Sequence, residues 1–221
     1  MVITDRRRLA EALAVPVGEV LPHLVAQLEG ALRGGADRVY LREPDLDVRH
    51  SMGVVHQVTR RLPHCRHRIV VRDRADVAAA LDVGVHLPEQ GLTIDQARHV
   101  LRNPLAPVGR AVHTPDEAAA SRDATYLVAG TVKATRSKPG LVQPLGWDGL
   151  RAICEAAAST PVLAVGGLGT EDIPVLKRSG ARGLAAIGLF IPTRNCTNVT
   201  SWTIERLTYV RNCVDSVEQP T

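Results

Sequence analysis

The chain alternates short apolar runs with amphipathic stretches eight times, and this repetition constrains the fold more than any other feature. The runs are continuously apolar rather than alternating in polarity, which is typical of parallel strands covered by helices on both faces. Eight strand–helix units in 221 residues predict a (β/α)8 barrel, the TIM-barrel fold of the α/β class. We expect residues 1–221 to form one such domain.

The expected elements follow directly from these patterns. Strands are predicted at Val2 to Thr4, Arg38 to Arg42, Arg68 to Val71, Gly84 to Leu87, Ala106 to Val112, Tyr126 to Gly130, Pro161 to Val165 and Gly183 to Ile187. Helices are predicted at Val17 to Arg33, Val48 to Leu62, Ala75 to Leu81, Thr93 to Leu101, Pro115 to Arg122, Trp147 to Ala157, Glu171 to Ser179 and Ser201 to Val217.

Composition narrows the function classes. Aromatic residues make up 3% of the chain and the net charge of +4 is spread over dispersed arginines, so we expect no nucleic-acid partner. No apolar run has the length of a membrane span, and we expect neither a membrane partner nor a secretory signal. The cysteines show no paired spacing, which predicts a reducing, cytoplasmic setting. A homo-oligomer is compatible with the sequence.

In a barrel of this kind the site lies at the C-terminal ends of the strands. After the sixth strand comes a loop that carries Thr135, Ser137 and Lys138, side chains suited to holding an anion. Gly166-Gly167 after the seventh strand and Gly188 after the eighth form the usual phosphate site of barrels, where backbone N–H groups meet phosphate oxygens. A plain strand-to-helix turn is the alternative for the glycine pair. The sequence therefore predicts a small phosphorylated ligand.

Three further side chains follow strands. His113, after the fifth strand, is a candidate catalytic residue because imidazole exchanges protons near neutral pH. Arg42 could bind phosphate or carboxylate, or form a salt bridge with Glu43 or Asp73. Asp73 could hold Mg²⁺ or cap the next helix. We expect His86, by contrast, to point into the barrel core.

Several motifs occur in a characteristic order: Tyr40-Leu-Arg-Glu43, Val71-Arg-Asp-Arg74, Gly84-Val-His-Leu87, Gly109 to His113, Gly130 to Lys138 and Val165-Gly-Gly-Leu168. Together they resemble the thiamin phosphate synthase and thiazole tautomerase (TenI-type) superfamily, from Val2 to about Phe190. The synthase joins a thiazole phosphate to a pyrimidine pyrophosphate, with Mg²⁺ helping pyrophosphate to leave. The tautomerase moves a proton on a thiazole carboxylate phosphate, and the resemblance places its acid/base at His113.

The chain departs from the synthase pattern at four positions. Pro44 stands where the pattern has Lys, Arg72 where it has Asn, Gly91 where it has a second metal-binding Asp, and Ala111 where it has Ser. The thiazole-phosphate half of the pattern is better kept than the pyrophosphate half. Pyrophosphate departure builds up charge that needs cations, whereas tautomerisation needs much less.

These departures favour a TenI-like thiazole tautomerase in thiamin biosynthesis, an isomerase that needs no cofactor. The first alternative is a divergent thiamin phosphate synthase, a transferase acting on hydroxymethylpyrimidine pyrophosphate, with Asp73 as a Mg²⁺ ligand. The second alternative is a non-catalytic phosphate-ligand binder or regulator.

Overall fold

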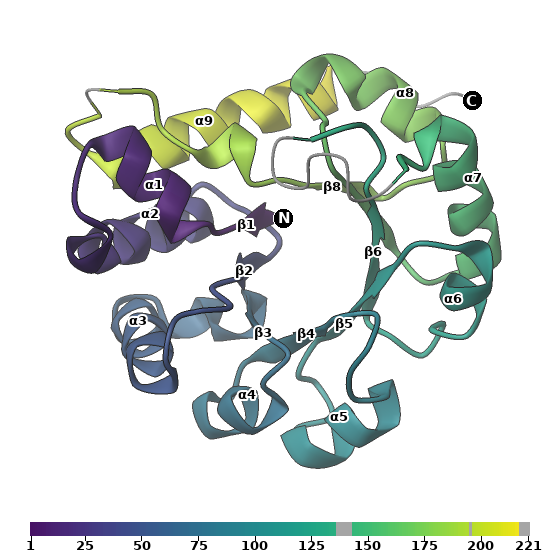
Figure 1. Cartoon of the computed structure of the whole chain (residues 1–221), viewed down its shortest axis with the longest axis horizontal. Helices are drawn as coiled ribbons and strands as arrows, with labels where there is room; N and C mark the ends of the chain where they lie inside the picture. Colours follow the sequence, from purple (N-terminus) through teal and green to yellow (C-terminus); the bar gives the residue numbers. More distant parts are fainter. Residues whose placement is uncertain (136–142, 195, 217–221) are drawn as a thin grey trace.

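The computed structural model describes residues 1–135, 143–194 and 196–216, and these contain eight parallel strands in one sheet. Each strand pairs with the next in the order of the sequence. A further bridge between Val2 and Ala186 joins the last strand back to the first. Figure 1 shows the strands as a ring with helices around its outside. The predicted (β/α)8 barrel is therefore confirmed.

The bounds of the elements agree closely with the sequence pattern. The strands are β1 (Val2–Ile3), β2 (Val39–Leu41), β3 (Ile69–Arg72), β4 (Gly84–Leu87), β5 (Val108–Val112), β6 (Tyr126–Gly130), β7 (Val162–Val165) and β8 (Gly183–Ala185). The helices are α1 (Arg6–Leu13), α2 (Leu21–Arg33), α3 (Val48–Arg61), α4 (Ala75–Leu81), α5 (Ile94–Leu101), α6 (Pro115–Ala119), α7 (Gly146–Ala157), α8 (Ile173–Arg178) and α9 (Val199–Asp215). Short 3₁₀ helices are η1 (Val17–Glu19), η2 (Pro63–Arg68), η3 (Thr170–Asp172) and η4 (Gly188–Phe190).

Helix α1 is an element that the sequence pattern did not predict. Its N-cap, Asp5, accepts a hydrogen bond from the Arg8 backbone N–H, and Ala14 ends it in the left-handed conformation. The helix is amphipathic but spans only eight residues, and its three opening arginines make it polar on average, so no apolar run marks it in the sequence. The expected helix from Val17 to Arg33 is accordingly shorter, and starts after the turn of η1.

The barrel interior is filled by a layer of rings from alternate strands. Tyr40 on β2, His86 on β4 and Tyr126 on β6 are all buried, and the His86 ring lies 4.7 Å from that of Tyr40 and 5.7 Å from that of Tyr126, centroid to centroid. Gly109 on β5 makes room, because a Cβ there would lie 2.2 Å from the Tyr126 ring. The outer core between strands and helices is aliphatic. The expectation that His86 points into the core is confirmed.

Among the described helices, none combines the length and apolar character needed to cross a membrane. The four cysteines form no disulfide bond: Cys65, Cys154, Cys196 and Cys213 are all free.

Candidate functional site

The C-terminal ends of the strands surround a cavity of about 750 Å³. Most of the residues predicted from the sequence line it: Arg42, Asp73, His113, Thr135, Gly166, Gly167 and Gly188. Ser137 and Lys138 lie outside the described residues. A volume in this range accommodates a small organic ligand rather than a polymer. The layer of rings, with His86 and Tyr40 at its surface, forms the floor of this cavity.

One end of the cavity is built by glycine turns. Gly166 (φ 103°) and Gly167 (φ 65°) follow β7 in a conformation that favours glycine. A Cβ on Gly167 would lie 2.5 Å from the Ala134 carbonyl oxygen, so the loop after β6 packs directly on this turn. The Lys133 backbone N–H donates to the Gly166 carbonyl over 3.0 Å. The two strand ends predicted to share an anion therefore lie together.

Arg8 reaches the same end of the cavity from α1. Its Nη2 atom lies 3.5 Å from the position that a Cβ on Gly188 would occupy. Arg8 lines the cavity, and no hydrogen bond or ion pair joins its guanidinium to another residue within the described ranges. Sequence reasoning missed this residue because α1 was not predicted. The Arg6-Arg7-Arg8 run directly after the first strand was the available signal.

Lys133 does not serve this end of the cavity. Its Nζ lies 3.0 Å from both carboxylate oxygens of Asp172, and the same carboxylate accepts a hydrogen bond from the Gly169 backbone N–H. The ion pair fastens the loop after β6 to the turn after β7. The charge of Lys133 is thus committed to the scaffold of the site.

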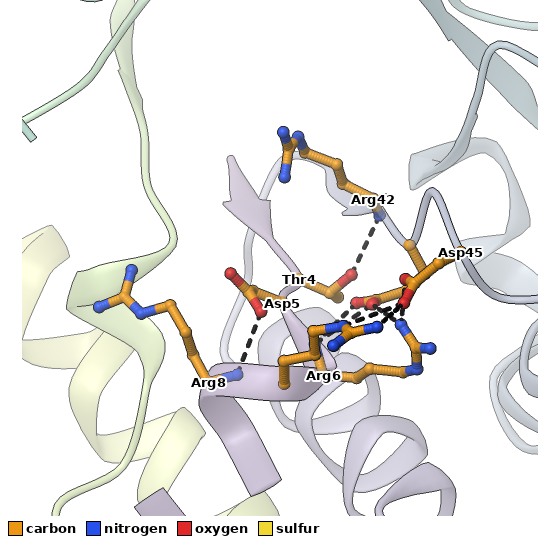
Figure 2. A network of polar contacts seen from close by, with 8 residues as sticks. Thr4, Asp5, Arg6, Arg8, Arg42 and Asp45 are labelled. Atoms are coloured by element: carbon orange, nitrogen blue, oxygen red, sulfur yellow. Dashed lines mark hydrogen bonds and ion pairs between the residues drawn. The ribbon is translucent and has the colours of Figure 1, made fainter. Parts of the chain in front are cut away.

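A polar network below the rim orients the end of β2 (Figure 2). The buried Glu43 carboxylate accepts from the Arg6 backbone N–H at 3.0 Å and from the Arg6 guanidinium at 3.3 Å. Arg6 also donates to Asp45 at 2.5 Å. Burial raises the pKa of Glu43, while hydrogen bonds from Arg6 and Arg7 lower that of Asp45. This network ties β1 and α1 to the segment after β2.

The Arg42 side chain is not part of this network and lines the cavity instead. The Arg42 backbone N–H donates to the Thr4 hydroxyl at 3.0 Å, and Figure 2 shows its guanidinium pointing away from Arg6 and Asp45. Successive side chains of a strand point to opposite faces, so burying Glu43 turns Arg42 inward. The alternative of a salt bridge from Arg42 to Glu43 or Asp73 is not seen; Glu43 pairs with Arg6 instead.

Arg72 lines the cavity beside Arg42. Leu41 pairs with Val71 in the β2–β3 register, so the next residues, Arg42 just after β2 and Arg72 at the end of β3, are neighbours at the rim. Within the described ranges neither guanidinium forms an ion pair with a carboxylate. Two arginines side by side, with Asp73 the carboxylate beside them, favour an anion between them.

Asp73 does not cap the next helix. Arg74 occupies the N-cap position of α4 and no side chain bonds there, whereas Asp73 adopts φ 53° and donates its backbone N–H to the His86 carbonyl at 3.0 Å. Its carboxylate lies near position 91: a Cβ on Gly91 would be 3.1 Å from Asp73 Oδ1. The structure thus brings together the two positions to which the resemblance assigns metal ligands, and only one of them carries a carboxylate.

The donor set does not fit a protein-built Mg²⁺ site. Mg²⁺ prefers oxygen ligands in an octahedral arrangement, and proteins usually offer one or two carboxylates beside substrate phosphates. In the described part of the chain no three His, Cys, Asp or Glu residues gather in a way that could hold a metal ion. Arg72, a cation, occupies the rim next to Asp73. The described lining therefore offers Mg²⁺ too few ligands for a site made by the protein alone.

His113 lies at the rim between the two ends of the cavity. Its Nδ1 contacts the Gly130 carbonyl oxygen, so this nitrogen carries the proton and Nε2 faces Glu89, whose carboxylate oxygen is 3.7 Å away. The His113 backbone N–H donates to Glu117 at 2.6 Å. These contacts fix the ring and leave Nε2 accessible, since about a third of the side chain is exposed (32%).

The floor of the cavity is kept uncharged by burial. Desolvation lowers the pKa of His86 to about 3, helped by the charges of Arg110, Arg42 and Arg72. Burial likewise raises the pKa of Tyr40 to about 12. Above this neutral floor, the charge lining the rim comes mainly from Arg8, Arg42 and Arg72, with Asp73 and Glu89 opposing them.

Comparisons with known proteins agree on one family. A family model described as thiamine monophosphate synthase matches residues 3–190. A thiamine-phosphate synthase of Chloroflexus aurantiacus is 34% identical over 78% of this chain and 80% of its own length, and one of Anaeromyxobacter dehalogenans is 37% identical over 84% and 83%. The solved structure of a thiamine phosphate pyrophosphorylase from Pyrococcus furiosus has a TM-score of 0.71 at 28% identity, covering 96% of this chain and 95% of that one.

These findings correct the main functional prediction. The expectation of a thiazole tautomerase, an isomerase, is wrong, because the similar curated proteins are synthases, which are transferases. The prediction rested on the loss of charge at Pro44 and Gly91. The strand register places Arg72 next to Arg42 and both line the cavity, so the end of the cavity at β2 and β3 carries two arginines.

Proposed function

Because the chain belongs to the thiamine monophosphate synthase family, we propose that it is a thiamine-phosphate synthase, which joins a thiazole phosphate to hydroxymethylpyrimidine pyrophosphate. The observation that carries the proposal is the similarity to named synthases over about four fifths of both chains. The geometry supports it, since one cavity has two ends that each suit a phosphate group.

The thiazole phosphate binds at the glycine end. Backbone N–H groups after Gly166, Gly167 and Gly188 donate to its oxygens, and Arg8 adds a charge. Thr135 lines the same end. Ser137 and Lys138 remain part of the proposal on sequence alone, as members of the same loop.

The pyrimidine pyrophosphate binds with its pyrophosphate at the end formed by Arg42. In the reaction the bond between the pyrimidine methylene carbon and the pyrophosphate oxygen breaks, and its electron pair leaves with pyrophosphate. The thiazole nitrogen donates its lone pair to form the new C–N bond. Negative charge accumulates on the leaving group, so a fixed guanidinium there lowers the barrier.

His113 lies between the two ends and acts on neither phosphate. We assign it a positioning role: its Nδ1 contact to Gly130 holds the end of β6, and the residue lines the cavity in which the two substrate rings would meet. Loss of this side chain is expected to lower kcat about tenfold, the equivalent of one hydrogen bond, without abolishing turnover. An acid/base role would instead predict complete loss in the His113→Ala variant.

Thiamine phosphate formation from the two substrates tests the proposal. Product measured by chromatography is expected with the wild-type protein and not when either substrate is left out. Arg42→Met should lower kcat/KM at least a hundredfold, because a charge-assisted contact to the leaving group is lost. Arg60→Ala removes an exposed arginine at the end of α3 and serves as the matched control. No product from wild-type protein at saturating substrates, with or without added Mg²⁺, would overturn the proposal.

A further inference from the structure

The rim at β2 and β3 carries its positive charge at a different position from the one that the resemblance implies. Its pattern places a lysine at position 44 and an asparagine at position 72, whereas this chain has Pro44 and Arg72. One cation is thus lost and another gained. The new one lies on a strand end rather than on the segment beyond it.

Arg72 and Arg42 occupy equivalent places on neighbouring strands. Leu41 and Val71 are partners in the parallel ladder, and strands of a sheet lie about 4.8 Å apart. Both side chains are half-buried and line the cavity. Burial is the main cause of the low pKa of His86 and of the raised pKa of Tyr40. The charges of Arg42 and Arg72 lower the pKa of both residues, so both charges act on the same floor of the cavity. They face one space.

The scaffold does not neutralise this pair. In the part of the chain that the structure describes, neither arginine forms an ion pair: Glu43 and Asp45 pair with Arg6, Asp76 pairs with Arg74, and Asp73 lines the same cavity without an ion pair to either. Two arginines at one edge with a single carboxylate near them leave an excess of positive charge, and an anion bound between them offsets it. A pyrophosphate offers oxygens on two phosphorus atoms, which suits two planar forks.

This chain also lacks one of the two carboxylates that the resemblance assigns to metal binding at this rim. The position that would complete a carboxylate pair with Asp73 is Gly91, where a Cβ would lie 3.1 Å from Asp73 Oδ1. A second carboxylate at position 91 would bind cations together with Asp73. In the absence of cations it would repel pyrophosphate. With glycine there, the balance of fixed charge shifts toward direct anion binding.

We infer that Arg72, together with Arg42, binds the pyrophosphate group directly and supplies the positive charge for which the resemblance uses a lysine and Mg²⁺. The inference rests on the proposed function for the identity of the ligand. Its consequence is that pyrophosphate binds to this chain in the absence of a divalent cation, and that Arg72 stabilises the charge that develops as the leaving group departs.

Calorimetric titration of the full chain with inorganic pyrophosphate in EDTA tests this without turnover. We expect binding by wild-type protein, at least tenfold weaker binding by Arg72→Asn, and partial recovery by Arg72→Lys, which keeps the charge but loses the fork. Arg60→Ala should bind as wild type does. Circular dichroism of each variant establishes that it is folded, and Arg72→Lys keeps the test decisive where Arg72→Asn does not fold.

The outcomes separate the inference from the proposed function. Pyrophosphate binding that requires Mg²⁺, or that is the same in Arg72→Asn, overturns the inference even where thiamine phosphate is produced. Metal-free binding that depends on Arg72, in a protein that makes no thiamine phosphate, supports the anion site while the synthase proposal fails.

Discussion

Replacing His86 by leucine tests whether the floor of the cavity is held neutral by burial. His86 is 4% exposed, and its Nδ1 lies 3.3 Å from the Tyr126 hydroxyl. Burial and three nearby arginines lower its pKa from 6.5 to about 3. The folded protein therefore keeps this ring neutral at pH values where the unfolded chain protonates it.

The magnitude follows from that difference in pKa. At pH 5 the unfolded state binds nearly one proton more at this position than the folded state does, so stability falls as pH falls below 6.5. Integration from pH 8 to pH 5 gives a loss of about 2 kcal/mol attributable to His86. The loss continues to grow until the pH approaches 3. Leucine cannot titrate, so the variant lacks this contribution.

Urea unfolding of the wild-type and His86→Leu proteins at pH 8, 6.5 and 5 measures it. At pH 8 the variant should be less stable, because the Tyr126 hydroxyl loses a buried partner at a cost of about 1–3 kcal/mol. At pH 5 the gap between the two should have moved by about 2 kcal/mol in favour of the variant. His56→Gln, at an exposed position of α3, should follow the wild type. A gap that stays the same at all three pH values would refute a buried, neutral His86.

Two further predictions concern the scaffold of the site. Gly167→Ala should destabilise the fold by about 1–3 kcal/mol and weaken thiazole-phosphate binding, since its φ is 65° and its Cβ would meet the Ala134 carbonyl at 2.5 Å. Gly53→Ala, in an open place on α3, should instead stabilise by about 0.5–1 kcal/mol in the same urea titrations. Glu43→Gln should lower the free energy of unfolding by about 1–3 kcal/mol because Arg6 loses a buried charged partner; an unchanged midpoint would argue against the network of Figure 2.

The sequence predicted the barrel because its signal is local and repeated. Continuous apolar runs such as Tyr126 to Gly130 are typical of parallel strands covered on both faces, and eight of them in this length predict a closed ring. Helix α1 escaped the same reasoning because it is short and, with three arginines at its start, polar on average, and it buries only Arg6, Leu9 and Ala10. Its formation depends on the cap at Asp5 and on packing against neighbours.

The candidate site was predictable in outline for the same reason. Strand ends in a parallel barrel share one rim, so Arg42, Asp73 and His113 could be assigned to one cavity from their positions alone. Position along a strand says which residues reach the rim. It does not say which of them are already paired with a neighbour.

The tertiary structure decided the balance of charge in the cavity, and with it the interpretation of the departures from the family pattern. In the sequence alone, Pro44 lacks the lysine charge of the family pattern and Gly91 lacks its carboxylate. In space, Arg72 lies beside Arg42, and Glu43 turns to Arg6 instead. The sequence determined the strand order and the inward direction of His86, because both depend on local burial. The pairing of charges depends on distances between separate strands and loops, and only the folded chain sets those distances.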